Sequence, residues 1–329
     1  MHRSNRDLQK KPSALSFSSN IAPVAVFAYN RPAHFQKTIA ALSANALAAQ
    51  SDVFVYLDGP KTENDFVANK KIQEICNGAN EFRSLTLFRR DRNFGLASSI
   101  TSGVTELCES HGRVIVLEDD LVTSPFFLTY MNDALNLYQN EDAVASIHGY
   151  IYPIAATLPQ TFFLRGADCW GWGTWQRAWD HFEPQGSLLL SKIKELQLED
   201  EFNFGGSSRN TEMLEDQIAG RNNSWAIRWH ASAFIKNMLT LYPGRSLVKN
   251  IGNDGSGTHC PSSMCYDAPI NGTPMSLNRI AIARNYQAYD EFKVFFEKLS
   301  TNAKQTRKSK TFFHLLLTKI FHKIFGQQL

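Results

Sequence analysis

Short apolar runs alternate with longer amphipathic segments along the first 120 residues. Each apolar run is ended by polar or turn-forming residues and is expected to be a buried strand; the runs cover 24–28, 53–57, 85–88 and 114–117. The segments between them place apolar residues at helical spacing; they cover 33–49, 63–78 and 95–108. Strands that alternate with helices form parallel β-α-β units. The pattern predicts an α/β fold with a Rossmann-like, mostly parallel sheet flanked by helices.

The second half of the chain shows a less regular pattern. Strands are expected near 144–148 and at 239–243, and helices at 173–180, around 214–216 and at 225–237. Between them lie a Gly- and Trp-rich loop at 166–172, a polar stretch at 186–210 and a Gly-rich polar loop at 250–259. We expect a disordered lead over 1–20, one domain over 21–265 and a helical, basic, amphipathic tail over 266–329.

The bulk composition limits the partners and the location. The chain has 329 residues, a net charge of +3 and 20% charged side chains, so nucleic acid is not an expected partner. Its five cysteines form no regular framework, and their odd number indicates a reducing compartment. The polar N-terminal segment lacks the apolar region of a signal peptide. We expect a cytoplasmic protein, either soluble or peripheral on the inner face of the membrane.

Three consecutive acids, Glu118, Asp119 and Asp120, follow the apolar run at 114–117. Adjacent carboxylates repel one another, so their burial at a strand end is unfavourable unless a cation neutralises them. Mg²⁺ or Mn²⁺ accepts oxygen ligands, and its remaining positions suit two phosphate oxygens. A solvated acidic turn is the alternative. The position at a strand end, where ligands bind in α/β sheets, favours a metal and diphosphate site.

Four motifs occur in a familiar order: Tyr29 to Pro32, Leu57 to Gly59, Asn93 to Ala97 and Val116 to Leu121. Together they resemble those of glycosyltransferases with the GT-A fold. The chain resembles bacterial enzymes of polysaccharide and lipopolysaccharide synthesis, and its Glu-Asp-Asp motif is similar to that of N-acetylglucosaminyltransferase I. The resemblance covers roughly residues 22–260. It implies a GT-A domain that binds a nucleotide-sugar, expected to be UDP-linked, and a divalent metal.

The resemblance also implies roles for single residues at the first motifs. Arg31 would lie beside the diphosphate or the uracil, and a guanidinium offers two donors to phosphate. Asp58 would accept a hydrogen bond from the uracil. Asp120 would be the main direct metal ligand, while Glu118 and Asp119 would shape the turn or meet the ribose. Turn chemistry remains the alternative for both Arg31 and Asp58.

The segment from Gly166 to Gly173 resembles the Gly-rich loop that lines the donor sugar and acceptor in GT-A enzymes. Glycine permits close backbone approach, and a tryptophan face can stack on a sugar ring. Trp170 and Gly171 are therefore expected to contact the donor, with Trp172 and Trp175 nearby. The alternative is aromatic packing under a loop.

Leu214, Glu215 and Asp216 match the x-Glu-Asp motif of the same fold. By this resemblance Asp216 is the general base of an inverting reaction, which requires one base opposite the leaving group. Glu215 is a rival base, and a solvated acidic helix start is the alternative reading. His259 resembles the C-terminal histidine that ligates the metal or binds diphosphate, and imidazole is an acceptable Mn²⁺ ligand.

The tail at 304–325 mixes lysine and arginine with phenylalanine, leucine and isoleucine at helical spacing. Such a basic amphipathic helix can bind an anionic membrane surface, which would suit a lipid-linked saccharide acceptor. Docking on its own domain is the alternative. Two other functions stay open for the chain: a nucleotidyltransferase, which would need a Gly-rich basic loop after the first strand, and a non-catalytic carbohydrate-binding protein.

Overall fold

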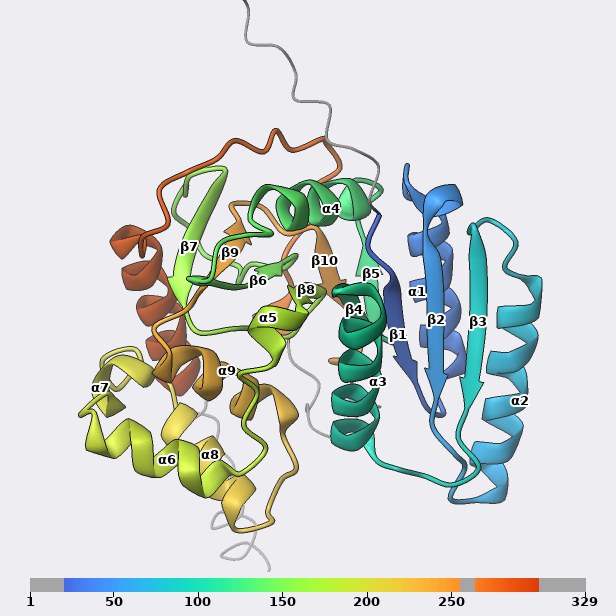
Figure 1. Cartoon of the computed structure of the whole chain (residues 1–329), viewed down its shortest axis with the longest axis horizontal. Coiled ribbons are helices and arrows are strands. Elements are labelled where there is room, and N and C mark those ends of the chain that lie inside the picture. Colours follow the sequence, from blue (N-terminus) through green and yellow to red (C-terminus); the bar gives the residue numbers. More distant parts are fainter. Residues whose placement is uncertain (1–20, 255–263, 302–329) are drawn as a thin grey trace, which may run out of the picture.

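An eight-stranded mixed sheet runs through the protein in the order β3-β2-β1-β4-β8-β6-β9-β7 (Figure 1). The computed structural model describes residues 21–254 and 264–301. The strands of this sheet are β1 (Val24–Ala28), β2 (Asp52–Leu57), β3 (Ser84–Arg89), β4 (Arg113–Glu118), β6 (Val144–His148), β7 (Thr161–Arg165), β8 (Trp172–Trp175) and β9 (Leu239–Pro243). A separate antiparallel pair joins β5 (Leu121–Thr123) to β10 (Val248–Asn250).

The first four strands are parallel, and their order contains the reversal that usually marks a ligand site. β1 pairs with β2 on one side and with β4 on the other, and β2 pairs with β3. The chain therefore proceeds outward from β1 to β3 and then returns to the far side of β1. In open α/β sheets, ligands bind outside the carboxyl ends of the strands at such a reversal. Here that position lies between the ends of β1 and β4.

The remaining strands make the sheet mixed. β8 is antiparallel to both β4 and β6, and β7 is antiparallel to β9. β6 and β9 are parallel to each other. The predicted class, an α/β fold with a mostly parallel sheet flanked by helices, is confirmed.

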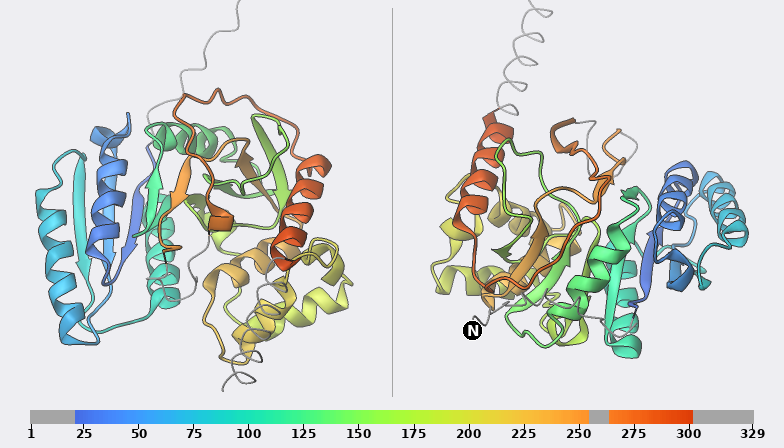
Figure 2. Two further views of the ribbon diagram at one scale, coloured as in Figure 1. Left: turned by 180° about the vertical axis from the view of Figure 1, so that it is seen from behind. Right: turned by 90° about the horizontal axis from the view of Figure 1, so that it is seen from above.

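Helices cover both faces of the sheet. They are α1 (Pro32–Ser43), α2 (Glu63–Gly78), α3 (Leu96–His111), α4 (Phe127–Leu137), α5 (Gln176–Trp179), α6 (Gly186–Glu195), α7 (Glu199–Phe202), α8 (Asn210–Ile218) and α9 (Trp225–Ile235). Apolar residues of α1, α2 and α4 share one core, and those of α3 and α9 share a second core on the other face. Figure 1 shows α3 in front of the sheet, and Figure 2 shows α1 and α2 in front when the molecule is seen from behind. Two 3-10 turns are also present, Ala48–Gln50 and Met264–Tyr266.

Two expectations for the second half are wrong. Residues 173–175 belong to strand β8, not to a helix. Trp172 packs in one core and Trp175 in the other, so this segment alternates between the two faces of the sheet as a strand does. The polar stretch at 186–210 contains helices α6 and α7, because Leu189, Ile193 and Phe202 are enough to form an apolar face against α9.

The described C-terminal part packs on the sheet. Asn271 donates its backbone N–H to Ser246 at 2.7 Å, and a helix over 286–301 buries Phe292 against Phe162 and Tyr242. Residues 1–20 and 302–329 lie outside the described residues, so the expected lead, the amphipathic tail and the domain limits stay predictions. Within the described part of the chain, no helix combines the length and apolar character needed to span a membrane.

Close packing of α3 on β1 generates a stability prediction. A Cβ atom added to Gly103 would lie 2.8 Å from the ring of Phe27. We expect Gly103→Val to lower the free energy of unfolding by about 1–3 kcal/mol, because the core must be overpacked. Gly78→Val is the matched control, since nothing lies within 4 Å of that position. Urea denaturation measures both; equal stabilities would contradict the packing described here.

Candidate active site at the carboxyl ends of β1 and β4

The residues that follow β1 and β4 meet at the reversal of strand order. Phe27 in β1 is in register with Glu118 in β4. The segments that follow the two strands therefore lie side by side. The segment after β1 contributes Arg31, and the segment after β4 contributes Asp120. The sheet thus brings together the acidic triplet and the arginine that the sequence singled out.

Arg31 forms an ion pair with the triplet. Its Nη1 donates to Oδ2 of Asp120 at 2.7 Å and lies 3.8 Å from Oδ1 of Asp119. Both Arg31 and Asp120 keep some contact with solvent, with side chains 17% and 16% exposed. Arg31 precedes Pro32 at the start of α1, but its side chain makes no capping hydrogen bond to that helix. Its guanidinium is directed to the carboxylates instead.

The triplet is electrostatically strained. Burial, together with repulsion from Asp120, raises the pKa of Glu118 to about 8 and that of Asp119 to about 7, while Arg31 partly opposes both shifts. Asp119 accepts one hydrogen bond from the backbone N–H of Tyr29 at 3.4 Å. Within the described residues, no hydrogen bond to the carboxyl group of Glu118 is present. A further positive charge at this position would favour the ionised forms.

The segment after β10 lies against the triplet. Ile251 donates its backbone N–H to the carbonyl of Asp120 at 2.9 Å. A Cβ atom at Gly252 would lie 2.0 Å from Oδ2 of Asp120 and 3.0 Å from Nη2 of Arg31, so a larger residue here would displace these two side chains. Asp254 then places its carboxylate 4.0 Å from Nη2 of Arg31. Arg31 therefore has acidic neighbours from two parts of the chain.

The side chains at this site offer oxygen ligands to the metal that the sequence resemblance implies. Carboxylate oxygens are the ligands that Mg²⁺ and Mn²⁺ prefer, and burial together with repulsion from Asp120 raises the pKa values of Glu118 and Asp119, which a bound cation would lower. The described residues contain no group of three His, Cys, Asp or Glu side chains able to hold a metal on their own. Asp120 thus fits a cation whose other ligands are water and phosphate. His259 lies outside the described residues, and its role as a ligand stays a prediction.

Asp58 lies at the end of β2 and joins two loops. Its carboxylate accepts hydrogen bonds from the backbone N–H groups of Phe94 at 2.7 Å, Gly95 at 2.9 Å and Gly59 at 3.0 Å. The side chain is buried. These bonds connect the end of β2 to the start of α3. Asp58 thus has the role in loop structure that was the alternative to a nucleotide contact. A uracil contact by Asp58 stays a prediction.

Trp170 and Gly171 lie between β7 and β8. The Trp170 backbone N–H donates to Nε2 of His148 at 3.1 Å, and its partly buried ring packs edge-on against Tyr150 at 4.8 Å. Gly171 has a φ of +65°, and its carbonyl accepts from the N–H of Gly149 at 2.7 Å. The loop is therefore tied to the end of β6, and sugar contacts by Trp170 and Gly171 stay predictions.

The other two tryptophans of this segment are core residues. Trp172 is 0% exposed and Trp175 is 4% exposed. Trp172 packs on Trp225 and Trp229 of α9 at centroid distances of 5.5 and 6.0 Å. For Trp172 and Trp175 the structure thus supports the alternative reading, aromatic packing under a loop, because neither ring presents a face to solvent.

Asp216 lies on α8, which packs on α6, α7 and α9 and has no extensive contact with the sheet. Its Oδ1 accepts from Nε of Arg221 at 2.7 Å, and its side chain is 36% exposed. Glu215, its neighbour on the same helix, lies 3.7 Å from Nζ of Lys194. No hydrogen bond or ion pair within the described residues joins either acid to the triplet, so the choice between them stays open.

Arg228 in α9 is occupied by its own surroundings. Its Nε donates to the carbonyl of Ser224 and its Nη1 to that of Pro184, each at 3.1 Å. Arg228 therefore links the start of α9 to the segment that precedes α6.

Sequence reasoning missed two residues of α2 that hold the loop after β1. Asp65 accepts hydrogen bonds from the hydroxyl of Tyr29 at 2.8 Å and from Nδ2 of Asn30 at 2.6 Å. Asn69 donates its Nδ2 to the carbonyl of Tyr29. The spacing of Thr62 and Asp65 is that of a capping box, which would have located the helix start. The capping-box spacing does not indicate that Asp65 also contacts the loop after β1.

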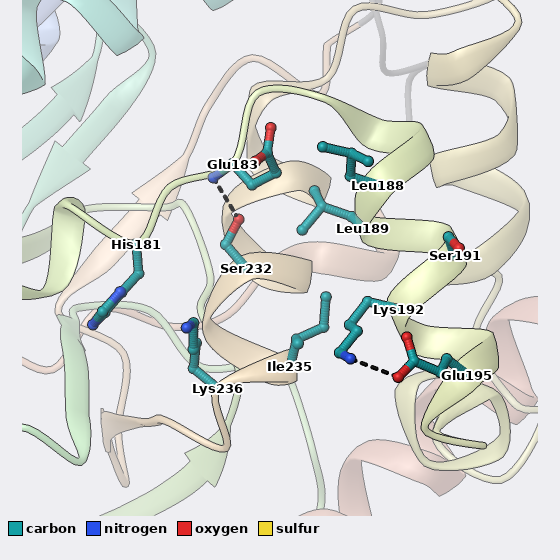
Figure 3. Close-up of a pocket in the computed structure, with 10 residues that line it drawn as sticks. All are labelled: His181, Glu183, Leu188, Leu189, Ser191, Lys192, Glu195, Ser232, Ile235 and Lys236. Carbon is teal, nitrogen blue, oxygen red and sulfur yellow. Dashed lines mark hydrogen bonds and ion pairs between the residues drawn. The ribbon is translucent and has the colours of Figure 1, made fainter.

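A hollow of about 420 Å³ lies away from the triplet, between α6 and the last turns of α9 (Figure 3). Its polar side chains are partly engaged with each other: Lys192 pairs with Glu195 at 2.7 Å, and Ser232 accepts from the N–H of Glu183 at 3.0 Å. None of the predicted site residues lines it. The site at the strand ends is thus defined by charge and topology and not by the hollow.

No protein-family model matches the chain, and no curated protein matches it. Solved structures with partial likeness include the mannosyltransferase PcManGT from Pyrobaculum calidifontis in complex with GDP-Man and Mn²⁺, at 15% identity and a TM-score of 0.29, over 42% of this chain and 40% of that one. S. aureus TarS 1–349 matches at 12% identity and 0.33, over 47% of each chain. A UDP-glucose pyrophosphorylase complexed with UDP-glucose matches at 13% and 0.34, over 68% of this chain and 90% of that one. The chain thus spans less than half the length of the first two, and likenesses of this size assign no family and no activity to it.

The raised pKa values generate a prediction on pH and metal. Unfolded carboxyl groups titrate near pH 4, so between pH 7 and 8.5 the folded chain releases protons from Glu118 and Asp119 that the unfolded chain has already lost. Stability should therefore fall as pH rises through this window. Mg²⁺ should raise the melting temperature more at pH 8.5 than at pH 7.

Glu118→Gln should flatten this pH dependence, whereas Glu109→Gln, the same change at an exposed position, should not. Differential scanning fluorimetry measures each case. A pH dependence that is the same in Glu118→Gln and the unmodified protein would contradict the assignment of the titration to the triplet.

Proposed function

We propose that this protein is an inverting, metal-dependent glycosyltransferase of the GT-A fold. It transfers a sugar from a nucleotide-sugar, UDP-linked in the first instance, to a saccharide or lipid-linked saccharide acceptor in surface polysaccharide synthesis. The observation that carries the proposal is the pairing of Arg31 with Asp120 at the reversal of strand order. An acidic triplet and an arginine at this position supply the two kinds of group that a metal–diphosphate requires.

Two groups of the protein would neutralise the negative charge of the donor diphosphate. Asp120, supported by Asp119 and Glu118, would hold Mn²⁺ or Mg²⁺, which neutralises a departing nucleoside diphosphate. Arg31 would turn part of its hydrogen bonding from Asp120 to the phosphate oxygens, since a guanidinium can serve both. Gly252 leaves room beside both side chains because it has no Cβ atom.

The acceptor hydroxyl must lose a proton during transfer. We assign this role to Asp216, a half-exposed carboxylate whose partner Arg221 lies five residues away on the chain. A single displacement with inversion needs one such base and no covalent intermediate. Trp170 and Gly171 are assigned to the sugar, since they lie in the Gly-rich loop that their own bonds tie to the end of β6.

The loop after β1 disfavours a nucleotidyltransferase. That class would need a Gly-rich loop whose backbone N–H groups surround phosphate. Here the loop is Tyr-Asn-Arg-Pro, and Pro32 at the start of α1 has no N–H to donate. The negative charge of the ligand is matched by the Arg31 side chain instead.

The acceptor and the location rest on the tail. We propose that residues 304–325, which lie outside the described residues, bind an anionic membrane surface and bring the enzyme to a lipid-linked acceptor. The protein would then be cytoplasmic and peripheral on the inner face of the membrane.

Isothermal titration with UDP tests the donor site. Binding should require Mn²⁺, and Asp120→Ala should abolish it because the cation loses its main ligand. Asp142→Ala removes an exposed aspartate elsewhere and should bind like the unmodified protein. UDP binding that is independent of both Mn²⁺ and Asp120 would contradict the proposal.

Asp216→Asn tests the base. Release of UDP from UDP-sugars in the presence of saccharide acceptors should fall by at least about 100-fold, the usual effect of losing a general base. Affinity for Mn²⁺–UDP should stay near that of the unmodified protein. Glu215→Gln is the matched change at the neighbouring acid; if it abolishes transfer and Asp216→Asn does not, Glu215 is the base.

A further inference from the structure

The loop Tyr29-Asn30-Arg31 has few means of holding its own shape. β1 ends at Ala28 and α1 begins at Pro32, so three residues connect the strand to the helix. Pro32 restricts the backbone of Arg31 to non-helical conformations, and Arg31 adopts φ −117° and ψ 66°. The backbone N–H of Tyr29 also reaches Asp119 at 3.4 Å. The loop therefore contacts the triplet twice, once through the backbone of Tyr29 and once through the side chain of Arg31.

α2 holds this loop from the side away from the triplet. The carboxylate of Asp65 accepts hydrogen bonds from the hydroxyl of Tyr29 at 2.8 Å and from Nδ2 of Asn30 at 2.6 Å. Asn69, one turn later on the same face of the helix, donates to the carbonyl of Tyr29. Asp65 and Asn69 are both buried, at 7% and 6% exposure. Two side chains and one carbonyl of the loop are thus fixed by a single helix face.

The contacts of Asp65 exceed those of a helix cap. A capping box needs only the reciprocal bonds between Thr62 and Asp65, and both are present. The bonds to Tyr29 and Asn30 come from a segment about 35 residues earlier in the chain. Hydrogen bonds from Asn30 and Tyr29 hold the pKa of the Asp65 carboxyl well below its usual range, so it is an ionised acceptor at neutral pH. Burial and Asp65 raise the pKa of Tyr29 to about 12, so its hydroxyl stays a donor.

We propose that Asp65 is a positioning residue for the metal–diphosphate site: through Tyr29 and Asn30 it sets the place of Arg31 against Asp120 without touching the ligand. This inference rests on the proposed function, because the consequence it names is affinity for a metal–nucleotide. In this proposal, α2 controls the geometry of the site although the residues assigned to bind the ligand lie on other segments.

The test compares Asp65→Asn with Thr62→Ala in the full chain. Asparagine has the shape of aspartate but replaces one acceptor oxygen with a donor, so the loop loses its anchor. Thr62→Ala weakens the cap of α2 and leaves the bonds from Asp65 to the loop in place. By titration with Mn²⁺–UDP, Asp65→Asn should bind about tenfold to a hundredfold more weakly, the range seen when a partner that orients a ligand residue is removed. Thr62→Ala should lower the melting temperature yet bind like the unmodified protein.

A purely structural role for Asp65 would give a different result: both variants would lose stability, and neither would lose affinity at a temperature where it is folded. That outcome overturns the proposal. Should Asp65→Asn not fold, Tyr29→Phe removes one loop bond only, and it should show an affinity between those of the unmodified protein and a protein without the anchor. Unchanged affinity in Tyr29→Phe would then overturn the proposal.

A second measurement separates this inference from the proposed function. Hydrogen exchange of the Tyr29 amide, which is bonded to Asp119, reports the position of the loop without any ligand. Exchange should be faster in Asp65→Asn and unchanged in Thr62→Ala. If the unmodified protein binds no Mn²⁺–UDP, the proposed function fails, and this exchange result alone supports or overturns the positioning role.

Discussion

Repulsion among three consecutive carboxyl groups is the constraint around which this part of the protein is organised. Glu118, Asp119 and Asp120 leave the end of β4 into a partly buried position, where the pKa values of the first two are raised. In the described part of the chain, the guanidinium of Arg31 lies against these acids, with Nη1 2.7 Å from Oδ2 of Asp120. A cation bound beside these acids would favour their ionised forms, and this is the physical basis of the proposed metal site.

The acids at this edge of the sheet fall into two groups. Asp58 and Asp65 are satisfied by hydrogen bonds from neighbouring loops, and they hold the ends of β2 and β1 in place. Glu118, within the described residues, accepts no hydrogen bond, and Asp120 is paired with Arg31. Structural carboxylates are thus distinguished from the proposed ligand-binding ones by what already surrounds them. The hydrogen bonds of Asp58 and Asp65 connect the loops beside the triplet to neighbouring elements, which is how we propose that the ligand-binding groups are positioned.

Much of the first half could be predicted from the sequence, because buried parallel strands are apolar runs with polar ends. In the second half, the strands near 144–148 and at 239–243 and the helices around 214–216 and at 225–237 were also predicted. The strand at Trp172 was not, since it has a glycine within it and its faces belong to different cores. Because this strand was not recognised, the core positions of Trp172 and Trp175 were not predicted either. The three adjacent acids could be recognised in the sequence as a candidate site. The contact of Asp65 with the loop after β1 could not. A contact between a helix start and a distant loop depends on tertiary placement, which single-sequence periodicity does not encode.

The measurement that tests this account most directly is anomalous diffraction from crystals grown with Mn²⁺ and UDP. The account predicts one manganese peak within bonding distance of a carboxylate oxygen of Asp120, bridged to the diphosphate, with Arg31 turned toward a phosphate oxygen. Nucleotide bound with manganese elsewhere, or Arg31 making no contact with a bound diphosphate, would contradict the assignment of this strand-end triplet as the donor site.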